Sequence, residues 1–252
     1  ESDYEPEYLT VAFDLKAPTF RHLEYEDYKA GRKAMPPELA MQMPIIKDVL
    51  RAMNIEILEL EGYEADDIIG TVAQEAEKAM IQPLIITGDK DALQLVSERT
   101  RVIITKRGIT DFELYDPAKM KERYNLTPKQ FIDLKGLMGD SSDNIPGIPG
   151  VGEKTGIKLL EQFGSIDNML AHTDEISAQK LRNKVEENAQ LALMSKRLAT
   201  INVNVPIDID IEKFRLREPD YDKLIEIYTK LEFNSFLKKL KITPQKNVQM
   251  FK

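Results

Sequence analysis

Short acidic groups recur along the sequence at positions that could together bind divalent cations. The first is Asp14, directly after an apolar run, and the second lies in Glu64-Ala65-Asp66-Asp67. The third is Asp89-Lys90-Asp91, and the fourth pairs Asp140 with Asp143. Carboxylates packed together repel one another, and divalent cations remove that repulsion. All-oxygen ligands without His or Cys favour Mg²⁺ or Mn²⁺.

Each group by itself has an ordinary structural explanation. Acids in the first turn of a helix complement its dipole, which would explain residues 64–67. Asp91 has the position of a helix N-cap, and Asp140 with Asp143 could satisfy amides in a turn. It is the convergence of four such groups that favours a metal site.

The elements that must position these acids alternate between strands and helices. Apolar runs predict three strands, at 9–13, 55–60 and 83–87. Helical periods lie between and after them, at 45–53, 65–80 and 92–96. This alternation predicts a mostly parallel central sheet with flanking helices, closed at its edge by a hairpin over 102–115 that turns around Gly108. Because parallel strands share one carboxyl edge, three of the four acidic groups should meet there.

The second half of the sequence is mainly helical. Helical periods lie at 119–124, 128–138, 154–163 and 178–201, and only 205–211 has the character of a strand. Pro and Gly residues interrupt the pattern between 146 and 152. We therefore predict an α/β domain at 1–130, a helical domain at 131–215, and a C-terminal helical segment with a linker at 216–252.

Composition excludes several classes of protein. The 252 residues include no Cys and two His, which excludes disulfides, thiol catalysis and zinc sites built on Cys or His. No apolar run is long enough to span a membrane, and no signal peptide is visible, so we expect a cytoplasmic protein. The 43 acids against 35 bases are unusual for a nucleic-acid-binding chain. Without the eight clustered carboxylates, acids and bases would be equal in number, so the acidity does not exclude nucleic acid.

Six segments of the sequence resemble, in order, the 5′ nuclease domain of bacterial DNA polymerase I, the prokaryotic branch of the flap endonuclease family. They are Phe13-Asp14, Pro18-Thr19-Phe20-Arg21-His22, Tyr28-Lys29-Ala30-Gly31-Arg32, Glu64-Ala65-Asp66-Asp67, Gly88-Asp89-Lys90-Asp91 and Gly139-Asp140-Ser141-Ser142-Asp143-Asn144-Ile145-Pro146-Gly147. The resemblance extends over residues 10–240. It implies a PIN-like α/β nuclease fold with a helical arch region at 18–40 and a helix–three-turn–helix at 145–163.

The resemblance implies a structure-specific nuclease that hydrolyses phosphodiesters at 5′ ends or flaps of duplex DNA. It would act on DNA with a 5′ flap, nick or RNA primer, in primer removal, nick translation and repair. Two or more Mg²⁺ or Mn²⁺ ions would activate water and stabilise the leaving oxygen. The matching metal-binding acids are Asp14, Glu64, Asp66, Asp67, Asp89, Asp91, Asp140 and Asp143. Of these, Asp67 matches the position whose role is least uniform in the family.

Three residues before the second acidic group are further candidates. Lys29 and Arg32 are three positions apart on a predicted helix, so they would project from one face. In the family the matching Lys and Arg touch the scissile phosphate, which makes them candidate catalytic residues; the alternative is a solvated basic helix. Tyr28 is expected either to stack on a DNA base or to pack inside the protein.

The segment from Ile145 to Gly156 resembles the helix–three-turn–helix that grips duplex DNA in the family. Gly-rich turns before a helix present amides to phosphates, so the candidate DNA contacts are Gly150, Gly152, Lys154 and Thr155. The structural alternative is that the two glycines only permit a tight connection. In the family this element often holds a K⁺ ion by its carbonyls.

One feature of the family is not found in the sequence. The family begins with a strand ending in Asp-Gly-Asn, several dozen residues before the strand that carries Asp14. No such strand precedes Leu9, so we expect an N-terminally truncated domain that binds flap DNA but cleaves it poorly. We also expect a monomer, followed in the full protein by polymerase domains.

Two other functions explain parts of the sequence. A non-catalytic branched-DNA-binding module would keep the gripping element but have an incomplete metal site. A Mg²⁺-dependent phosphatase would use Asp89-Lys90-Asp91, but it leaves the Gly- and Pro-rich turn unexplained.

Overall fold

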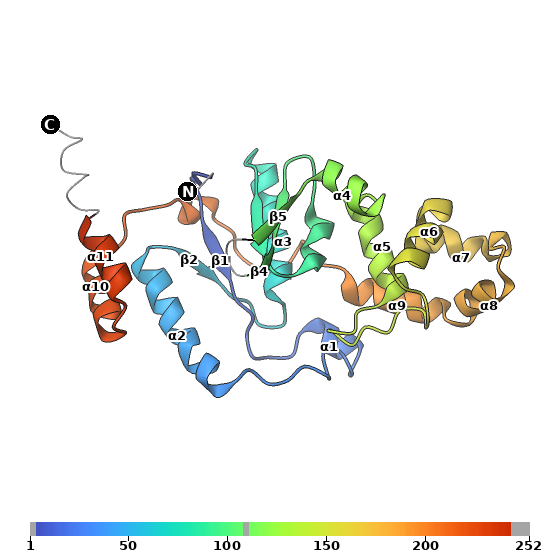
Figure 1. Ribbon diagram of the computed structural model, residues 1–252, viewed down its shortest axis with the longest axis horizontal. Helices are drawn as coiled ribbons and strands as arrows, with labels where there is room; N and C mark the ends of the chain where they lie inside the picture. Colours follow the sequence, from blue (N-terminus) through green and yellow to red (C-terminus); the bar gives the residue numbers. More distant parts are fainter. Residues whose placement is uncertain (1–3, 108–110, 243–252) are drawn as a thin grey trace. The chain divides into compact units, whose positions relative to one another are not determined.

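The computed structural model describes residues 4–107 and 111–242, and the chain divides into two compact units. The first unit comprises Glu1–Phe13, Ala34–Glu59 and Asp208–Lys252. The second comprises Asp14–Lys33 and Leu60–Ile207. Figure 1 shows the order of their elements along the chain.

The first unit contains a two-stranded parallel sheet. β1 (Thr10–Ala12) pairs with β2 (Glu56–Leu58), with Val11 opposite Ile57. Three α-helices accompany the sheet: α2 (Pro37–Ala52), α10 (Tyr221–Lys230) and α11 (Asn234–Ile242). Because α2 lies between β1 and β2 in the sequence, this strand–helix–strand unit confirms the predicted parallel pairing.

The second unit contains a three-stranded mixed sheet. β3 (Leu84–Thr87) pairs in parallel with β4 (Arg101–Arg107), and β4 pairs antiparallel with β5 (Asp111–Tyr115). This confirms the predicted edge hairpin, whose turn around Gly108 lies outside the described residues. The core of this unit includes Ile85 and Val102 from the sheet and Ala73 from α3 (Ala65–Lys78).

The α/β class is confirmed, but the strands are arranged differently from the expected single sheet. Within residues 4–107 and 111–242, β2 pairs only with β1, and β3 pairs only with β4. Each unit therefore has its own sheet. As a result, the shared edge of one parallel sheet is not what brings Asp14 to the acids that follow β3.

The helical part of the second unit follows β5. Its α-helices are α4 (Pro117–Tyr124), α5 (Pro128–Met138), α6 (Glu153–Phe163), α7 (Ile166–Ala171), α8 (Gln179–Glu187) and α9 (Ala189–Ala199). Helix α5 packs against α6, α7 and α9, and Figure 1 shows α6 and α9 beside it. Leu134 and Leu137 of α5 are fully buried in this contact, as is Ile166 of α7. This confirms the predicted helical region.

Local sequence signals explain where these helices begin. Thr127 Oγ1 accepts a hydrogen bond from Gln130 N, and Gln130 Oε1 accepts one from Thr127 N, which forms a capping box before α5. Asp116 caps α4 in the same way, by accepting from Lys119 N at 2.7 Å. Both helices have proline as their first residue, where the missing N–H costs nothing.

Three predicted elements differ in the structure. Instead of the α-helix predicted at 92–96, the structure has a 3₁₀ helix, η1 (Lys90–Leu95), with Val96 as its C-cap. The predicted helix at 178–201 is two helices, α8 and α9, which meet at Asn188. The strand predicted at 205–211 is wrong, because Pro206 has no N–H to donate and Ile207 N bonds to Val205 O in a tight turn.

None of the helices within the described residues is both long and apolar enough to span a membrane.

Candidate active site

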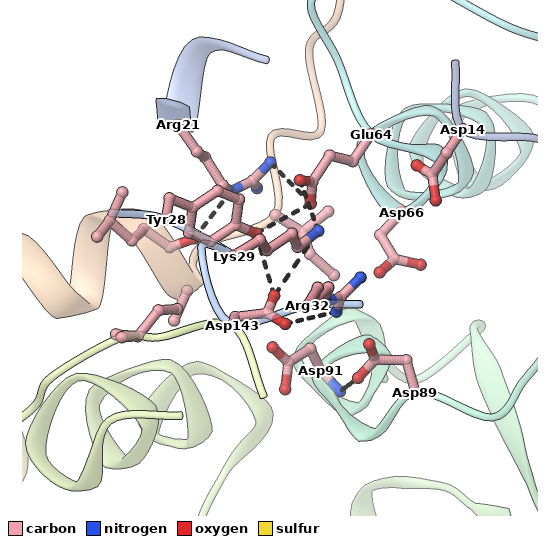
Figure 2. A pocket seen from close by; sticks show the side chains of 14 residues that line it. Asp14, Arg21, Tyr28, Lys29, Arg32, Glu64, Asp66, Asp89, Asp91 and Asp143 are labelled. Atoms are coloured by element: carbon pink, nitrogen blue, oxygen red, sulfur yellow. Dashed lines mark hydrogen bonds and ion pairs between the residues drawn. The ribbon is translucent and has the colours of Figure 1, made fainter. Parts of the chain in front are cut away.

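A polar pocket in the second unit collects six of the eight predicted metal-binding acids. The six are Asp14, Glu64, Asp66, Asp89, Asp91 and Asp143. The basic residues Arg21, Lys29 and Arg32 also line it, together with Tyr28 (Figure 2). The sequence therefore predicts most of the residues that meet here.

Backbone amides at helix starts position several of the acids. Asp14 Oδ1 accepts a hydrogen bond from Ala65 N, the first residue of α3, at 2.8 Å. Glu64 is the N-cap of that helix. The N-cap of η1 is Asp89, and not Asp91 as the sequence predicted: Asp89 accepts from Asp91 N at 2.9 Å, and Asp91 lies in the first turn. The capping explanation and the pocket explanation therefore both hold, because each cap places its carboxylate at the pocket.

Asp66 is the carboxylate that the protein leaves without a partner. Among the described residues it makes no hydrogen bond or ion pair, although it is half-buried. Figure 2 shows its carboxylate between Asp14 and Asp89. Burial first, and then the charges of Asp89 and Asp14, raise the pKa of Asp66 to about 7. The pocket thus concentrates more negative charge than its own cations compensate.

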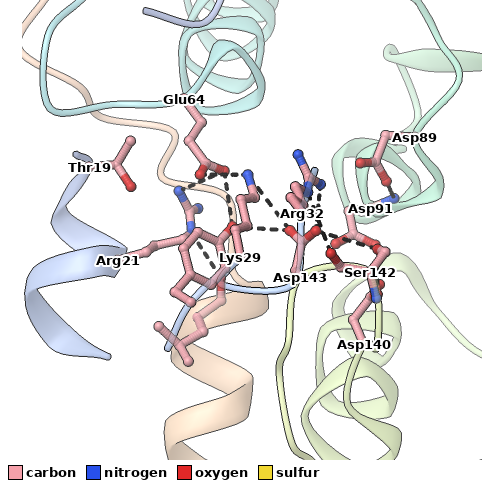
Figure 3. A network of polar contacts seen from close by, with 12 residues as sticks. Thr19, Arg21, Lys29, Arg32, Glu64, Asp89, Asp91, Asp140, Ser142 and Asp143 are labelled. Carbon is pink, nitrogen blue, oxygen red and sulfur yellow. Dashed lines mark hydrogen bonds and ion pairs between the residues drawn. The ribbon is translucent and has the colours of Figure 1, made fainter. Parts of the chain in front are cut away.

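A buried lysine joins two further acids. Lys135 Nζ lies 2.6 Å from Asp91 Oδ1 and also donates to Asp140 Oδ2. Burial raises the pKa of Asp91 to about 6, although the charge of Lys135 opposes the rise. The pKa of Asp140 falls to about 2, because hydrogen bonds from Lys135 and Ser142 outweigh the effect of burial. Asp140 does not line the pocket itself; Figure 3 shows it beside Ser142.

Basic side chains hold the other two acids, Glu64 and Asp143. Lys29 Nζ lies 2.6 Å from Glu64 Oε1 and 3.7 Å from Asp143 Oδ2. Arg32 Nη2 contacts Asp143 Oδ1 at 2.5 Å. The Tyr28 hydroxyl lies 3.1 Å from both Glu64 Oε2 and Asp143 Oδ2 (Figure 2). These contacts form a network of opposite charges along one side of the pocket.

Lys29 and Arg32 are not on a helix, which corrects the sequence prediction. Helix α1 (Phe20–Glu24) ends before them, and residues 26–31 form consecutive turns. Lys29 has a left-handed backbone with φ of 57°, and Arg32 N bonds to Lys29 O at 2.9 Å. The two side chains still face the same acids, because a turn also brings residues three apart together.

Two other predicted site residues, Tyr28 and Asp67, are buried. Tyr28 is only 3% exposed, which is the packing alternative, and its ring cannot stack on a DNA base in this conformation. Asp67 is fully buried, and Arg21 donates to both of its carboxylate oxygens at 2.8 Å. Backbone N–H groups of Glu64 and Asn202 complete the contacts of Asp67. It is therefore an internal ion-pair partner and not a pocket ligand.

Sequence reasoning missed two buried cations at this site, Arg21 and Lys135. Arg21 is 3% exposed and also donates to the carbonyls of Leu198 and Thr200. It lies in one of the segments that carry the family resemblance, but no role was assigned to it. A signal was available, since a cluster of acids within a folded domain requires buried cations as well as metal ions.

Three of the pocket acids, Glu64, Asp91 and Asp143, are bound to protein cations, whereas among the described residues Asp14, Asp66 and Asp89 are not. In the part of the chain that is described, no three His, Cys, Asp or Glu side chains are close enough to hold a metal ion. The donor set nevertheless fits Mg²⁺ or Mn²⁺, because all donors are carboxylate oxygens and Asp66 lacks a partner. Assembly of a site requires that carboxylates exchange protein cations for divalent ions.

Two glycines shape the loop that carries Asp140 and Asp143. Gly147 has φ of 59°, and a Cβ there would lie 2.3 Å from Gly139 N. Asp140 and Ile145 exchange two backbone hydrogen bonds of 2.8 Å, which closes the loop. Because the backbones at Gly139 and Gly147 almost touch, this acidic loop is fixed to the start of the next segment, the predicted helix–three-turn–helix.

The predicted DNA-gripping segment forms a loop from Ile145 to Gly152 that leads into α6. Gly150 has φ of +80°, and a Cβ there would lie 2.6 Å from Lys184 Nζ. Lys184 donates to Pro149 O at 3.1 Å. Gly152 has extended backbone, so positive φ is not the reason for this glycine. Lys154 is exposed and Thr155 is half-buried.

The raised pKa values predict how stability depends on pH when no divalent cation is present. Asp66 and Asp91 titrate near 3.8 when unperturbed, but at about 7 and about 6 in the folded chain. Between these values the folded chain binds more protons than the unfolded chain, so stability should fall as pH rises from about 4 to about 7. The expected loss is on the order of 2–4 kcal/mol.

Urea unfolding in EDTA at constant ionic strength, measured across this pH range, tests the prediction. Asp140 does not obscure the result, because its stabilising contribution is lost only as pH falls towards about 2. Stability that stays constant or rises through the window would contradict the proposed crowding of Asp66 and Asp91.

Two family models together match most of the chain. Residues 1–125 match the 5′–3′ exonuclease N-terminal resolvase-like domain. Residues 126–222 match the 5′–3′ exonuclease C-terminal SAM fold. The curated relatives are bacterial DNA polymerases I. That of Bacillus subtilis (strain 168) is 51% identical over 238 residues, and that of Bacillus caldotenax is 47% identical over 239 residues. These matches cover 94% and 95% of this chain but 27% of each relative.

Solved structures show the same fold at lower identity. A bacteriophage T5 D15 flap endonuclease variant, in a pseudo-enzyme-product complex with DNA and metal ions, is similar with a TM-score of 0.65 and 20% identity, over 92% of this chain and 82% of that one. The catalytic core of Rad2 in complex with a DNA substrate is similar with a TM-score of 0.58 and 18% identity, over 87% and 73%. The family models and the curated relatives together show that the chain belongs to the 5′–3′ exonuclease family and corresponds to the 5′ nuclease region of bacterial DNA polymerase I.

Proposed function

We propose that this chain is a divalent-metal-dependent 5′ nuclease that hydrolyses phosphodiesters at flaps, nicks and RNA-primed 5′ ends of duplex DNA. The observation that carries the proposal is Asp66, a half-buried carboxylate without a partner among other acids. Carboxylates crowded in a pocket, with a pKa raised by burial and by neighbouring acids, are typical of functional sites.

The carboxylates that line the pocket are the proposed metal ligands. Asp14, Asp66 and Asp89 are available without breaking an ion pair. Glu64 and Asp143 join them once Lys29 and Arg32 leave, whereas Asp91 and Asp140, both paired with Lys135, are the remaining ligands. Bound Mg²⁺ or Mn²⁺ would supply a water nucleophile at neutral pH and neutralise phosphate oxygens. We exclude Asp67 from this set because both of its oxygens are taken by Arg21.

Lys29 and Arg32 are proposed to contact the scissile phosphate. They face the acidic pocket from a turn, with Arg32 about half exposed, so they can exchange carboxylate partners for phosphate oxygens. Arg32 can bind a phosphate with two N–H groups, whereas Lys29 supplies a compact charge. Release of these residues from Glu64 and Asp143 would thus free the metal ligands and the phosphate contacts together.

The loop before α6 is the proposed grip on the DNA duplex. Gly150 and Gly152 expose backbone, and Lys154 and Thr155 lie in the first turn of α6, where the helix dipole favours phosphate. We also propose K⁺ at the carbonyls of this loop, although Lys184 already supplies one cation, at Pro149 O. Such contacts would read the backbone and not the base sequence.

Cleavage of a labelled 5′-flap duplex in Mg²⁺, with an EDTA control, tests the proposed function. We expect Mg²⁺-dependent release of the flap, and no cleavage of the same strand when it is presented without a duplex. Tight binding of the flap duplex with no cleavage in Mg²⁺ or Mn²⁺ would instead support the non-catalytic DNA-binding module.

Two substitutions should separate gripping from cutting. Lys154→Ala should weaken duplex binding and lower the slope of log affinity against log salt by about one, since one phosphate contact is lost. Lys29→Ala should slow single-turnover cleavage by about a hundredfold with little change in affinity. Exposed Lys180→Ala is the control for a general change of charge. If Lys29→Ala changed only the affinity, its assignment to the scissile phosphate would be wrong.

A further inference from the structure

Lys135 is more deeply buried than Lys29 and Arg32, the cations on the other side of the site. The residue is only 7% exposed, and its ammonium lies between Asp91 of η1 and Asp140 of the loop after α5. Lys29 and Arg32 lie on a turn at the pocket, with side chains 18% and 47% exposed. The site therefore has exchangeable cations on one side and an enclosed cation on the other.

The fold fixes Lys135 from its backbone as well as from its charge partners. It lies in α5 between Leu134 and Leu137, which are buried at 1% and 0% exposure. Its carbonyl accepts the N–H of Gly139, which directly precedes Asp140, at 2.8 Å. Helix α5 also packs against η1, which carries Asp91. The stem of Lys135 therefore starts from a fixed point in the core, and its ammonium is held at the two acids by burial and by both ion pairs.

We propose that Lys135 is a positioning residue that acts as a built-in cation for this half of the metal site. It holds Asp91 and Asp140 together when no divalent ion is bound, and it reduces the negative charge that a divalent ion meets on arrival. The inference rests on the proposed function, because it assumes that these carboxylates take part in metal binding.

If Lys135 has this role, removing its charge should change how much a divalent ion stabilises the fold. Without the ammonium, two half-buried carboxylates would repel each other with no compensation, so the fold would be weakened in the absence of a divalent ion. A divalent ion would then replace the missing charge and stabilise the fold more than in the unchanged chain. Since Lys135 and the divalent ion favour the same carboxylates, each lowers the gain from the other.

The experiment measures thermal unfolding in EDTA and across a Mg²⁺ titration. The test variant is Lys135→Met, which keeps the apolar stem but removes the charge, and Lys135→Arg is the conservative variant. The matched control is Lys196→Met, because Lys196 also bridges two carboxylates, Asp133 and Asp167, both at 2.8 Å. None of these acids lines the pocket.

We expect Lys135→Met to melt below the unchanged chain in EDTA and to approach it at saturating Mg²⁺. Its apparent Mg²⁺ affinity should be higher by about tenfold, a typical size for coupling between two ligands. Lys135→Arg should behave like the unchanged chain. Lys196→Met should lose the same stability with and without Mg²⁺.

An equal Mg²⁺-induced rise in melting temperature for Lys135→Met and the unchanged chain would overturn the inference alone. The absence of any Mg²⁺ effect on the unchanged chain would contradict the proposed function, and the inference with it. If Lys135→Met is unfolded in EDTA, recovery of its helical circular-dichroism signal on adding Mg²⁺ supports the proposal, and failure to recover contradicts it.

Discussion

Replacing Asp66 by asparagine is expected to slow cleavage of a 5′-flap duplex by about a thousandfold, or about 4 kcal/mol of transition-state stabilisation. Asp66 is the pocket acid that has no partner to exchange, so its oxygens are the most available to a metal ion. In EDTA the same substitution should stabilise the fold, by an amount on the order of 2–4 kcal/mol at neutral pH. The reason is that Asp66, with its pKa raised to about 7, is costly to ionise in the folded chain.

The test is specific because the same substitution should slow cleavage but stabilise the fold. Single-turnover cleavage at several Mg²⁺ concentrations measures the rate, and urea unfolding in EDTA measures the stability. Asp174→Asn, at an exposed acid of the same unit, controls for the change of net charge. A variant that cleaves normally at limiting Mg²⁺, or one that is destabilised in EDTA, would remove Asp66 from its central position in the proposal.

The acids that meet could largely be predicted from the sequence, because most of them follow a strand or open a helix, and Asp143 lies in a Gly-bounded loop after α5. The route by which they meet was different. Asp14 is bound to the first amide of α3, and β1 and β3 belong to separate sheets. A carboxylate that caps a helix is brought to that helix by its own hydrogen bond. The acids therefore still meet, although the predicted single sheet does not form.

Adjacent acids on one helix show what the sequence pattern cannot resolve. Asp66 and Asp67 are neighbours in α3, and successive residues of an α-helix point about 100° apart. Only one of them can face the pocket, and the pattern does not say which. The answer depends on Arg21 and Asn202, which are 46 and 135 residues away from Asp67 in the sequence.

Two basic residues, Lys29 and Lys135, also show what the sequence pattern cannot resolve. A spacing of three suits a helix and a turn equally, so Lys29 with Arg32 could be predicted to act together but not from which element. Lys135 stands in an ordinary helical pattern among leucines, where a lysine is usually exposed. Its burial depends on Asp91, which belongs to η1, and so it could not be read from the helix alone.

Replacing Asp67 by alanine is expected to destabilise the second unit by about 3–5 kcal/mol, a loss typical of breaking a buried ion pair. Asp67 is fully buried, and the change would leave the guanidinium of Arg21, which is 3% exposed, with only the more distant Glu64 as a charge partner, at 3.5 Å. Urea unfolding in EDTA measures the loss. Asp48→Ala, which breaks an exposed pair with Arg51 in which both side chains are 61% exposed, should change little.

The decisive comparison is how Asp67→Ala responds to Mg²⁺. If Asp67 only positions Arg21 and the start of α3, the Mg²⁺-induced gain in stability should match that of the unchanged chain. The double variant Arg21→Met with Asp67→Leu removes both charges, so it should recover part of the lost stability. If Asp67→Ala unfolds the unit, the double variant is the one in which the Mg²⁺ effect is measured. Loss of the Mg²⁺ effect in the folded double variant would return Asp67 to the metal ligands, and the ion pair seen here would then belong to the metal-free state alone.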